Sequence, residues 1–243
     1  MKYPLTYKEF GEHAILIEWP SLIKEEILTH ILSYQKLLKN ILSTKKFEYV
    51  PSYTSLAIID IEKQLNASEM IHLIENLDIK IDDKIELKRT LWKLPVCYED
   101  RFASDLNYVC EEKGLSKEEL INLHTGSVYT VYCMGFLPGF MYLGGLADRL
   151  HLKRRSSPRT SVPSGSVGIG GSQTGIYPQE SPGGWNLIGN CPVQLFNSSH
   201  NPPCFVTVGD RIQFYSISEQ EYEFLKIKVQ TGIYKPENKE LND

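Results

Sequence analysis

The sequence predicts an α+β protein with two domains: a small α/β sandwich of ferredoxin-like shape over residues 1–88 and a β-barrel or β-sandwich over residues 89–243. The pattern changes near residue 90. Before it, helix and strand signals alternate with a single glycine, and after it short strand-like segments are separated by Gly and Pro turns. Twelve of the 17 glycines lie between residues 135 and 189. Glycine weakens strands unless a positive φ or a close approach requires it, so this dense cluster indicates the functional part of the chain.

The first domain is expected to begin with a strand and a long helix. Residues 13–19 (HAILIEW) have the composition of a strand, and Ser21 is expected to cap a helix that runs to about residue 42. The apolar residues of this helix recur at helical spacing, as Ile23, Ile27, Ile31, Leu38 and Leu42. The pattern therefore favours a helix with one buried face.

A second strand and helix follow in the same order. Residues 54–61 (TSLAIIDI) are expected to form the strand, and Asn66 with Glu69 forms the capping-box signature that starts a helix. Strand-like segments are expected between this helix and residue 88. We interpret the domain as a structural or docking module without chemistry of its own.

The second domain is predicted to open with a strand and two short helices. Residues 89–98 (RTLWKLPVCY) form the strand, and residues 104–113 form a helix ended by Gly114. Ser116 begins the next helix, with Glu119 at the capping-box position.

Strands predominate after residue 126. A final helix is expected from Ser218, with Glu221 in the capping-box position. The expected strand segments lie at 127–134, around 162, and at 166–169, 174–177, 185–188, 193–196, 205–208 and 211–215. Many short strands with Gly and Pro turns are typical of a barrel or sandwich.

Composition excludes several classes of function. The formal net charge is -4, so a nucleic-acid partner is not expected, and no 18-residue apolar run suggests a membrane span. We expect a cytoplasmic protein whose five scattered cysteines are reduced thiols. The six histidines lack the spacing of a metal site, and no metal is expected.

Familiar catalytic motifs are also missing from the sequence. It contains no GxxxxGK[ST] phosphate loop, and the glycine-rich residues 165–175 do not match a dinucleotide-binding fingerprint. Residues 170–174 miss the nucleophile motif GxSxG at its last position. The catalytic residues are therefore unknown at this point.

Ordered blocks in the glycine-rich region resemble those of one protein family. They are GFLPGFMYL (135–143), SPR (157–159), VPSGSV (162–167), QTGIYP (173–178) and SPGGWNLIG (181–189). With FGEHAILIEW, PSYTSLAIID and VGDRIQF they are similar to the 5-oxoprolinase B-subunit family, also called KipI or allophanate hydrolase subunit 1. Met141 and Ser164 are small departures from the family pattern. The resemblance covers nearly the whole chain.

The resemblance implies an N-terminal α/β domain followed by a cyclophilin-like β-barrel. It also implies two partners: a C subunit, which is built on a similar barrel, and an A subunit of the LamB/YcsF type. Together the three subunits cleave 5-oxoproline to glutamate with ATP, which requires Mg²⁺. Another branch of the family inhibits a sporulation histidine kinase, and a fused relative of the B and C subunits forms the carboxyltransferase part of urea carboxylase.

Three functions stay open on the sequence: a subunit of an ATP-dependent 5-oxoprolinase, an inhibitor of a histidine kinase, and a stand-alone hydrolase acting on allophanate. The absence of a recognisable amidase nucleophile in the sequence weighs against the third. The lactam of 5-oxoproline is an unactivated amide, so its opening needs oxyanion stabilisation or activation by phosphoryl transfer.

The candidate site residues follow from this chemistry. Basic residues concentrate between 149 and 159, which favours recognition of a carboxylate or phosphate. The expected substrate-binding residues are Arg155, Arg159, Gln173, Tyr177 and Trp185. The expected anion-binding nest or site loop comprises Gly168, Gly170, Gly171, Phe136, Pro138, Gly139 and Phe140.

Each of these assignments has a structural alternative. The two arginines could be solvated charges at the barrel edge, and Tyr177 and Trp185 could be core or interface aromatics. For the loop of Phe136 to Phe140 we favour a rigid apolar segment that packs beneath the site or meets the C subunit. His124 is expected to be structural.

Overall fold

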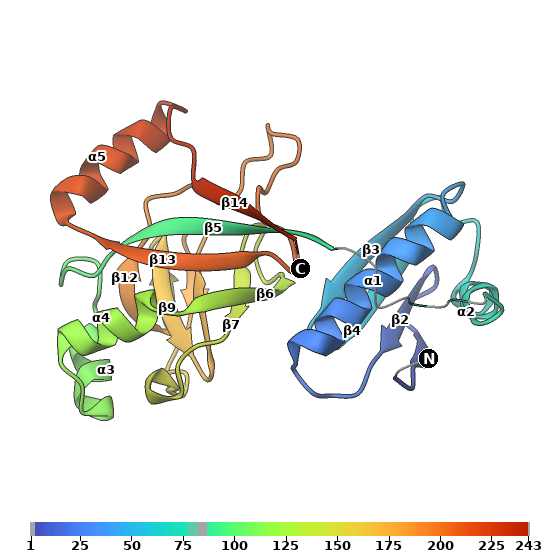
Figure 1. The fold of residues 1–243 in the computed structure, drawn as a ribbon, viewed down its shortest axis with the longest axis horizontal. Helices are drawn as coiled ribbons and strands as arrows, with labels where there is room; N and C mark the ends of the chain where they lie inside the picture. Colours follow the sequence, from blue (N-terminus) through green and yellow to red (C-terminus); the bar gives the residue numbers. More distant parts are fainter. Residues whose placement is uncertain (1–2, 78, 80, 82–86, 243) are drawn as a thin grey trace. The chain divides into compact units, whose positions relative to one another are not determined.

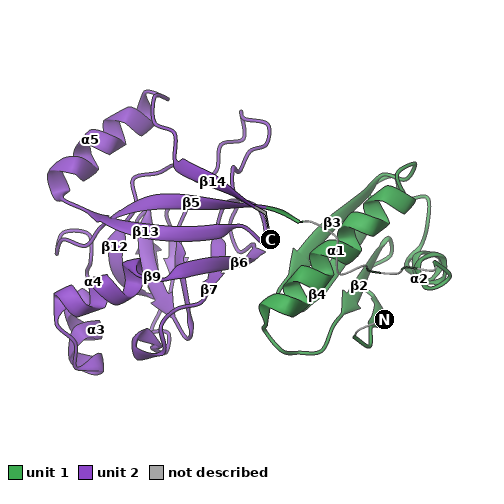
Figure 2. Ribbon diagram, viewed as in Figure 1, with its two compact units in different colours: residues 1–88, 242–243 green, residues 89–241 purple. Residues whose placement is uncertain are grey.

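A computed structural model describes every residue except 1–2, 78, 80, 82–86 and 243. The internal contacts divide the chain into two compact units, residues 1–88 and residues 89–241 (Figures 1 and 2). Each unit has its own hydrophobic core. Among the described residues, none of the helices has the length and apolar character needed to cross a membrane.

The first unit is an antiparallel sheet with two helices. Its strands are β1 (Thr6–Glu9), β2 (Ala14–Glu18), β3 (Phe47–Ser52) and β4 (Ser55–Asp60), and its helices are α1 (Glu25–Ile41) and α2 (Ala67–Glu75). The described strands run in the order β1-β2-β4-β3. Apolar residues of α1 and α2 pack with alternate residues of β2 and β4 to form the core.

One expectation for this unit differs from the structure, and another lies largely outside the described residues. The N-cap of helix α1 is Lys24 and the helix begins at Glu25, three residues later than expected from a cap at Ser21, and Ile23 is exposed before it. The ferredoxin-like arrangement needs a strand after α2, and that part of the chain lies largely outside the described residues. The capping box of Asn66 and Glu69 at the start of α2 is confirmed.

The second unit is built on a closed β-barrel, which agrees with the cyclophilin-like barrel expected for it. The barrel strands are β5 (Lys88–Cys97), β6 (Val128–Met134), β7 (Met141–Gly144), β9 (Ser166–Gly170), β10 (Gln173–Ile176), β12 (Asn186–Asn190) and β13 (Arg211–Ile217). They follow the order β6-β13-β5-β12-β9-β10-β7, and pairing of β7 with β6 closes the barrel. Strands β5 and β13 are parallel, and the other neighbours in the barrel are antiparallel.

Short elements surround the barrel. They are α3 (Leu106–Lys113), α4 (Lys117–Thr125), the 3₁₀ turn η1 (Asp148–Leu150), α5 (Glu219–Gln230), β14 (Glu237–Asn242) beside β5, and the pair β8 (Arg159–Val162) and β11 (Ser181–Gly183). The left-handed Gly114 ends α3 as expected, whereas the helix begins at Leu106, two residues after the expected start at Ser104. The capping boxes of α4 and α5 confirm the starts expected for those helices.

Two expected strands are irregular in the structure. Residues 193–196 and 205–208 lie outside the named strands. Prolines at positions 192, 202 and 203 adjoin both segments. Because proline has no backbone N–H to donate to a ladder, it limits strand pairing on either side of it.

A polar network inside the barrel holds His124 in one state. The imidazole is fully buried and stacks on Phe214, with ring centroids 4.8 Å apart. Its Nδ1 lies 2.7 Å from the hydroxyl of Tyr98, and its Nε2 lies 3.0 Å from that of Thr174. The Thr174 hydroxyl donates to the carbonyl of Gly168, so His124 donates from Nε2 and accepts at Nδ1. Burial lowers the pKa of His124 from 6.5 to about 3.

This network predicts a pH dependence of stability. Below pH 6.5 the unfolded chain binds a proton at His124, which the folded chain accepts only near pH 3. The free energy of unfolding should therefore fall by about 1.4 kcal/mol per pH unit through this residue as the pH drops from 6 to 4. In His124→Asn, the free energy of unfolding measured with urea at each pH should depend on pH with a slope that is shallower by that amount. Equal slopes in the two proteins would contradict the assignment.

Candidate functional site

The loop of residues 135–140, which joins β6 to β7, separates two hollows on the second unit. Phe136 adopts a left-handed backbone with φ of 69°, and its side chain is 61% exposed. A non-glycine residue with positive φ is uncommon and marks a constrained position. Phe136 and Phe140 face one hollow, whereas Pro138 faces the other. The loop expected from the sequence is therefore shared by two surfaces.

The first hollow, which we call the aromatic hollow, has a volume of about 280 Å³. It is lined by Phe136, Phe140, Tyr142, Arg154, Pro158, Tyr177, Pro182, Gly183, Gly184 and Trp185. Phe140 makes edge-to-face contacts with Tyr142, Tyr177 and Trp185 at centroid distances of 4.9, 5.3 and 5.4 Å. The structure thus brings four of the residues expected from the sequence, Phe136, Phe140, Tyr177 and Trp185, into one surface.

The glycines of β9 form the floor beneath Trp185. A Cβ atom on Gly168 would lie 3.0 Å from the Cβ of Trp185, and one on Gly170 would lie 2.5 Å from its Nε1. The expected anion nest is not formed here, because successive N–H groups of an extended strand point to opposite sides. Gly171 exchanges backbone hydrogen bonds with Leu152. Gly168 and Gly170 serve close packing of the indole, whereas Gly171 has a left-handed backbone with φ of 68°.

Arg155 and Arg159 share one buried carboxylate. Nη1 of Arg155 lies 3.0 Å from Oδ1 of Asp105, and Nη2 of Arg159 lies 2.6 Å from the same atom. The backbone N–H of Leu187 donates to Oδ2 of Asp105 at 2.7 Å. The side chain of Asp105 is only 5% exposed. The two arginines are thus paired with Asp105, which balances one of their two positive charges, and Arg155 remains exposed to solvent.

The cation at the aromatic hollow is Arg154, a residue that the sequence analysis did not select. Its guanidinium carbon lies 5.7 Å from the centre of the Trp185 ring. In the part of the chain that the structure describes, Arg154 has no carboxylate partner. The signal in the sequence that could have indicated Arg154 is its position directly before Arg155. Gln173 begins β10 and lines neither hollow.

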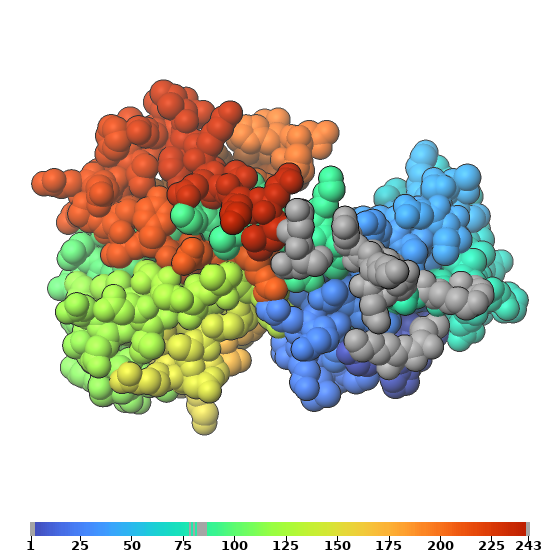
Figure 3. Space-filling view, viewed as in Figure 1, coloured from blue at the N-terminus to red at the C-terminus, as the bar shows by residue number. Residues whose placement is uncertain are grey.

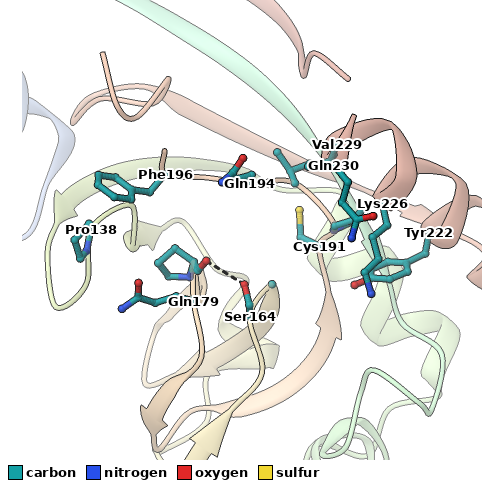
Figure 4. Close-up of a pocket in the computed structure, with 14 residues that line it drawn as sticks. Pro138, Ser164, Gln179, Cys191, Gln194, Phe196, Tyr222, Lys226, Val229 and Gln230 are labelled. Carbon is teal, nitrogen blue, oxygen red and sulfur yellow. Dashed lines mark hydrogen bonds between the residues drawn. The ribbon is translucent and has the colours of Figure 1, made fainter. Parts of the chain in front are cut away.

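The second hollow, which we call the polar hollow, has a volume of about 460 Å³. Its polar or charged side chains are those of Ser164, Gln179, Gln194, Tyr222, Lys226 and Gln230, and its other lining residues are Pro138, Gly165, Pro178, Cys191, Pro192, Val193, Phe196 and Val229. Figure 4 shows Tyr222, Lys226 and Gln230 on α5 at one side and Pro138, Ser164 and Gln179 on loops at the other.

Hydrogen bonds join the two sides of the polar hollow. The Tyr222 hydroxyl donates to Oδ1 of Asn190 at 2.9 Å, and Nδ2 of Asn190 donates to the carbonyl of Ser164 at 2.9 Å. The Ser164 hydroxyl donates to the carbonyl of Pro178 at 3.0 Å. Gly165, with φ of 80°, packs directly on Asn190, where a Cβ atom would collide with the amide. The walls are therefore held in place without a ligand.

A third hollow continues from the polar one. Its volume is about 470 Å³, and it shares Val193, Gln194, Val229 and Gln230 with the polar hollow. It runs between α5 and the loop of residues 197–205. In the space-filling view these two segments appear in red and orange (Figure 3).

Neither a thiol nucleophile nor a metal centre emerges at these surfaces in the part of the chain that is described. Burial raises the pKa of the Cys191 thiol to about 12, so the thiolate is not formed near neutral pH. No three His, Cys, Asp or Glu side chains gather in a metal-binding group among the described residues. These hollows can therefore bind a ligand or a partner through amides, aromatic rings and cations.

Comparison with known proteins identifies the family. The model of the carboxyltransferase domain, subdomain C and D, matches residues 5–206. The 5-oxoprolinase B subunit of Bacillus subtilis is 36% identical over 229 residues, which are 90% of this chain and 95% of that protein. The chain belongs to the 5-oxoprolinase B-subunit family.

Solved structures agree with the family fold. TTHA0988 is 31% identical with a TM-score of 0.69, and the match covers 88% of this chain and 40% of that one. Urea carboxylase of Kluyveromyces lactis has a TM-score of 0.79 at 20% identity, covering 98% of this chain and 24% of that enzyme. The second likeness concerns the fold alone. Residues from the glycine-rich blocks GFLPGFMYL, SPR, VPSGSV, QTGIYP and SPGGWNLIG line the aromatic and polar hollows.

The geometry at Asp105 predicts a structural role in this member of the 5-oxoprolinase B-subunit family. Asp105→Ala removes two charge-assisted hydrogen bonds and leaves the N–H of Leu187 without its acceptor, so the free energy of unfolding should fall by about 2–4 kcal/mol. Asp105→Asn keeps an acceptor and should lose about half as much. Asp100→Ala, at an exposed carboxylate, is the control and should change urea unfolding very little. Equal stability of Asp105→Ala and the wild type would refute the role.

Proposed function

We propose that this chain is the B subunit of an ATP-dependent 5-oxoprolinase, which cleaves 5-oxo-L-proline to L-glutamate together with its A and C subunits. The observation that carries the proposal is the near full-length relation to the 5-oxoprolinase B subunit of Bacillus subtilis. Proteins of the same name in Haemophilus influenzae and Escherichia coli O157:H7 are 48% and 42% identical over 122 and 132 residues. The term subunit in these names supports an assembly with other chains.

The chemistry of the reaction supports a division of labour among the subunits. Opening an unactivated lactam near neutral pH needs activation of its carbonyl oxygen, which phosphoryl transfer from ATP supplies. The sequence contains no recognisable phosphate-binding motif, so we assign no contact with ATP to this chain. In this proposal the chain recognises and positions the substrate, and the phosphoryl transfer takes place together with the A and C subunits.

The aromatic hollow is our candidate contact with the C subunit. Trp, Tyr and Arg side chains carry most of the binding energy in protein interfaces, and here Tyr142, Tyr177 and Trp185 lie beside Arg154. Phe136 stands exposed at the rim in edge-to-face contact with Phe140. Tyr177 and Trp185 are 2% and 4% exposed, so in this assignment they are core aromatics that support the contact surface from beneath.

Reconstitution tests the function directly. The purified chain alone should form no glutamate from 5-oxoproline and ATP, and addition of the A and C subunits should give ATP-dependent turnover. Coupled detection of glutamate and ADP measures both products. Robust turnover by the chain alone would overturn the subunit role, and no turnover by the complete mixture would overturn the activity.

Substitution at Phe136 tests the contact with the C subunit. Asn tolerates the left-handed backbone better than Phe does, so Phe136→Asn should keep or raise the melting temperature while weakening binding to the C subunit roughly 10- to 30-fold. Phe10→Asn, at an equally exposed phenylalanine of the first unit, is the matched control and should leave the affinity unchanged. Calorimetric titration measures the affinity of both variants for the C subunit. Wild-type affinity of the Phe136 variant would remove the aromatic hollow from the interface.

A further inference from the structure

The polar hollow has the composition of a site for a small amide acid. Three primary amides, from Gln179, Gln194 and Gln230, and one ammonium, from Lys226, line it, and no Asp or Glu among the described residues does. Within the described residues, no hydrogen bond engages the three amide groups. The hollow therefore presents donors, acceptors and one positive charge to whatever enters it.

Helix α5 places its part of this set rigidly. Tyr222, Lys226 and Gln230 follow one another at intervals of four residues and so lie on one face of the helix. The capping box of Ser218 and Glu221 fixes the start of α5, and the buried hydrogen bond from Tyr222 to Asn190 fixes its distance from the barrel. The backbone of Lys226 and Gln230 is thus fixed before a ligand binds, and their exposed side chains are ordered on binding.

A five-membered lactam complements these groups. Its ring holds the amide cis, so that the N–H and the C=O lie on the same side, and a glutamine amide can pair with both at once through two parallel hydrogen bonds. A carboxylate on the ring complements an ammonium. The apolar side chains of Val193 and Phe196 offer contact for the ring methylenes. The volume of the hollow lies within the range of roughly 300–1,000 Å³ found for small-molecule sites.

We infer that the polar hollow binds the substrate, a cyclic lactam carboxylate, with the lactam paired to Gln179 or Gln194 and the carboxylate paired to Lys226. This inference rests on the proposed function, which makes 5-oxoproline the substrate. It locates substrate on the opposite face of the 135–140 loop from the aromatic hollow. Arg155 and Arg159, which are committed to Asp105, are not needed for it.

The reconstituted complex tests the inference through its KM for 5-oxoproline. Lys226→Met removes a charge-assisted hydrogen bond, so KM should rise roughly 10- to 150-fold. Lys228→Met is the matched control on the same helix, because the ammonium of Lys228 lies over the Phe224 ring, 4.3 Å from its centre, and does not line the hollow. Its KM should equal that of the wild type.

Two inhibitors separate the two contacts. 2-Pyrrolidinone has the lactam without the carboxylate, so Lys226→Met should leave its inhibition constant unchanged, whereas the double variant of Gln179→Leu and Gln194→Leu should weaken its inhibition about tenfold or more. Cyclopentanecarboxylate has the ring and the carboxylate without the lactam and should show the reverse pattern. A wild-type KM in both the lysine variant and the glutamine variant, with normal melting temperatures, would overturn the inference and leave the function standing. No cleavage by the wild-type complex would overturn the function and the inference with it.

Discussion

The buried carboxylate of Asp105 is the interaction on which the functional face of the second unit depends. It lies at the start of α3 and accepts a hydrogen bond from β12 through the N–H of Leu187. It also binds Arg155 from the segment before β8 and Arg159 at the start of β8. A carboxylate that is 5% exposed is costly to bury unless its charge is compensated, and two guanidinium groups compensate it here. The same contacts fix residues 154–159 beside Trp185. The wall of the aromatic hollow is therefore positioned from within the barrel.

Close packing of glycine and indole gives this face its shape. Trp185 rests on β9 and β10 because Gly168, Gly170 and Gly175 leave room for it. The indole in turn supports Phe140 in the loop that divides the two hollows. The glycine-rich composition is thus a steric requirement of the barrel wall, and the surface chemistry comes from Arg154 and the rings above it.

Local signals in the sequence were sufficient for much of the fold and for part of the site. The capping boxes at Asn66, Ser116 and Ser218 appear where their spacing predicts them, because the interaction is completed within four residues. The partner of the two arginines could not be predicted in this way, since Asp105 lies about fifty residues away and only the closed barrel brings it near. The glycines were misleading for another reason. An anion-binding turn and a flat packing surface require the same residue, and only the fold shows that Trp185, which lies 10 to 17 residues after Gly175 and Gly168, packs on them.

The loop of residues 135–140 also has a thermodynamic consequence. Phe136 borders one hollow and Pro138 the other, so an event on either face acts on the same short and strained stretch of backbone. If docking of a protein at the aromatic face favours one position of the loop, affinity for a small molecule at the polar face changes by some factor. Linkage then requires that the small molecule change the affinity for the protein by the same factor. Binding of the protein at the aromatic face and binding of the small molecule at the polar face would then affect each other equally, through the six residues of this loop.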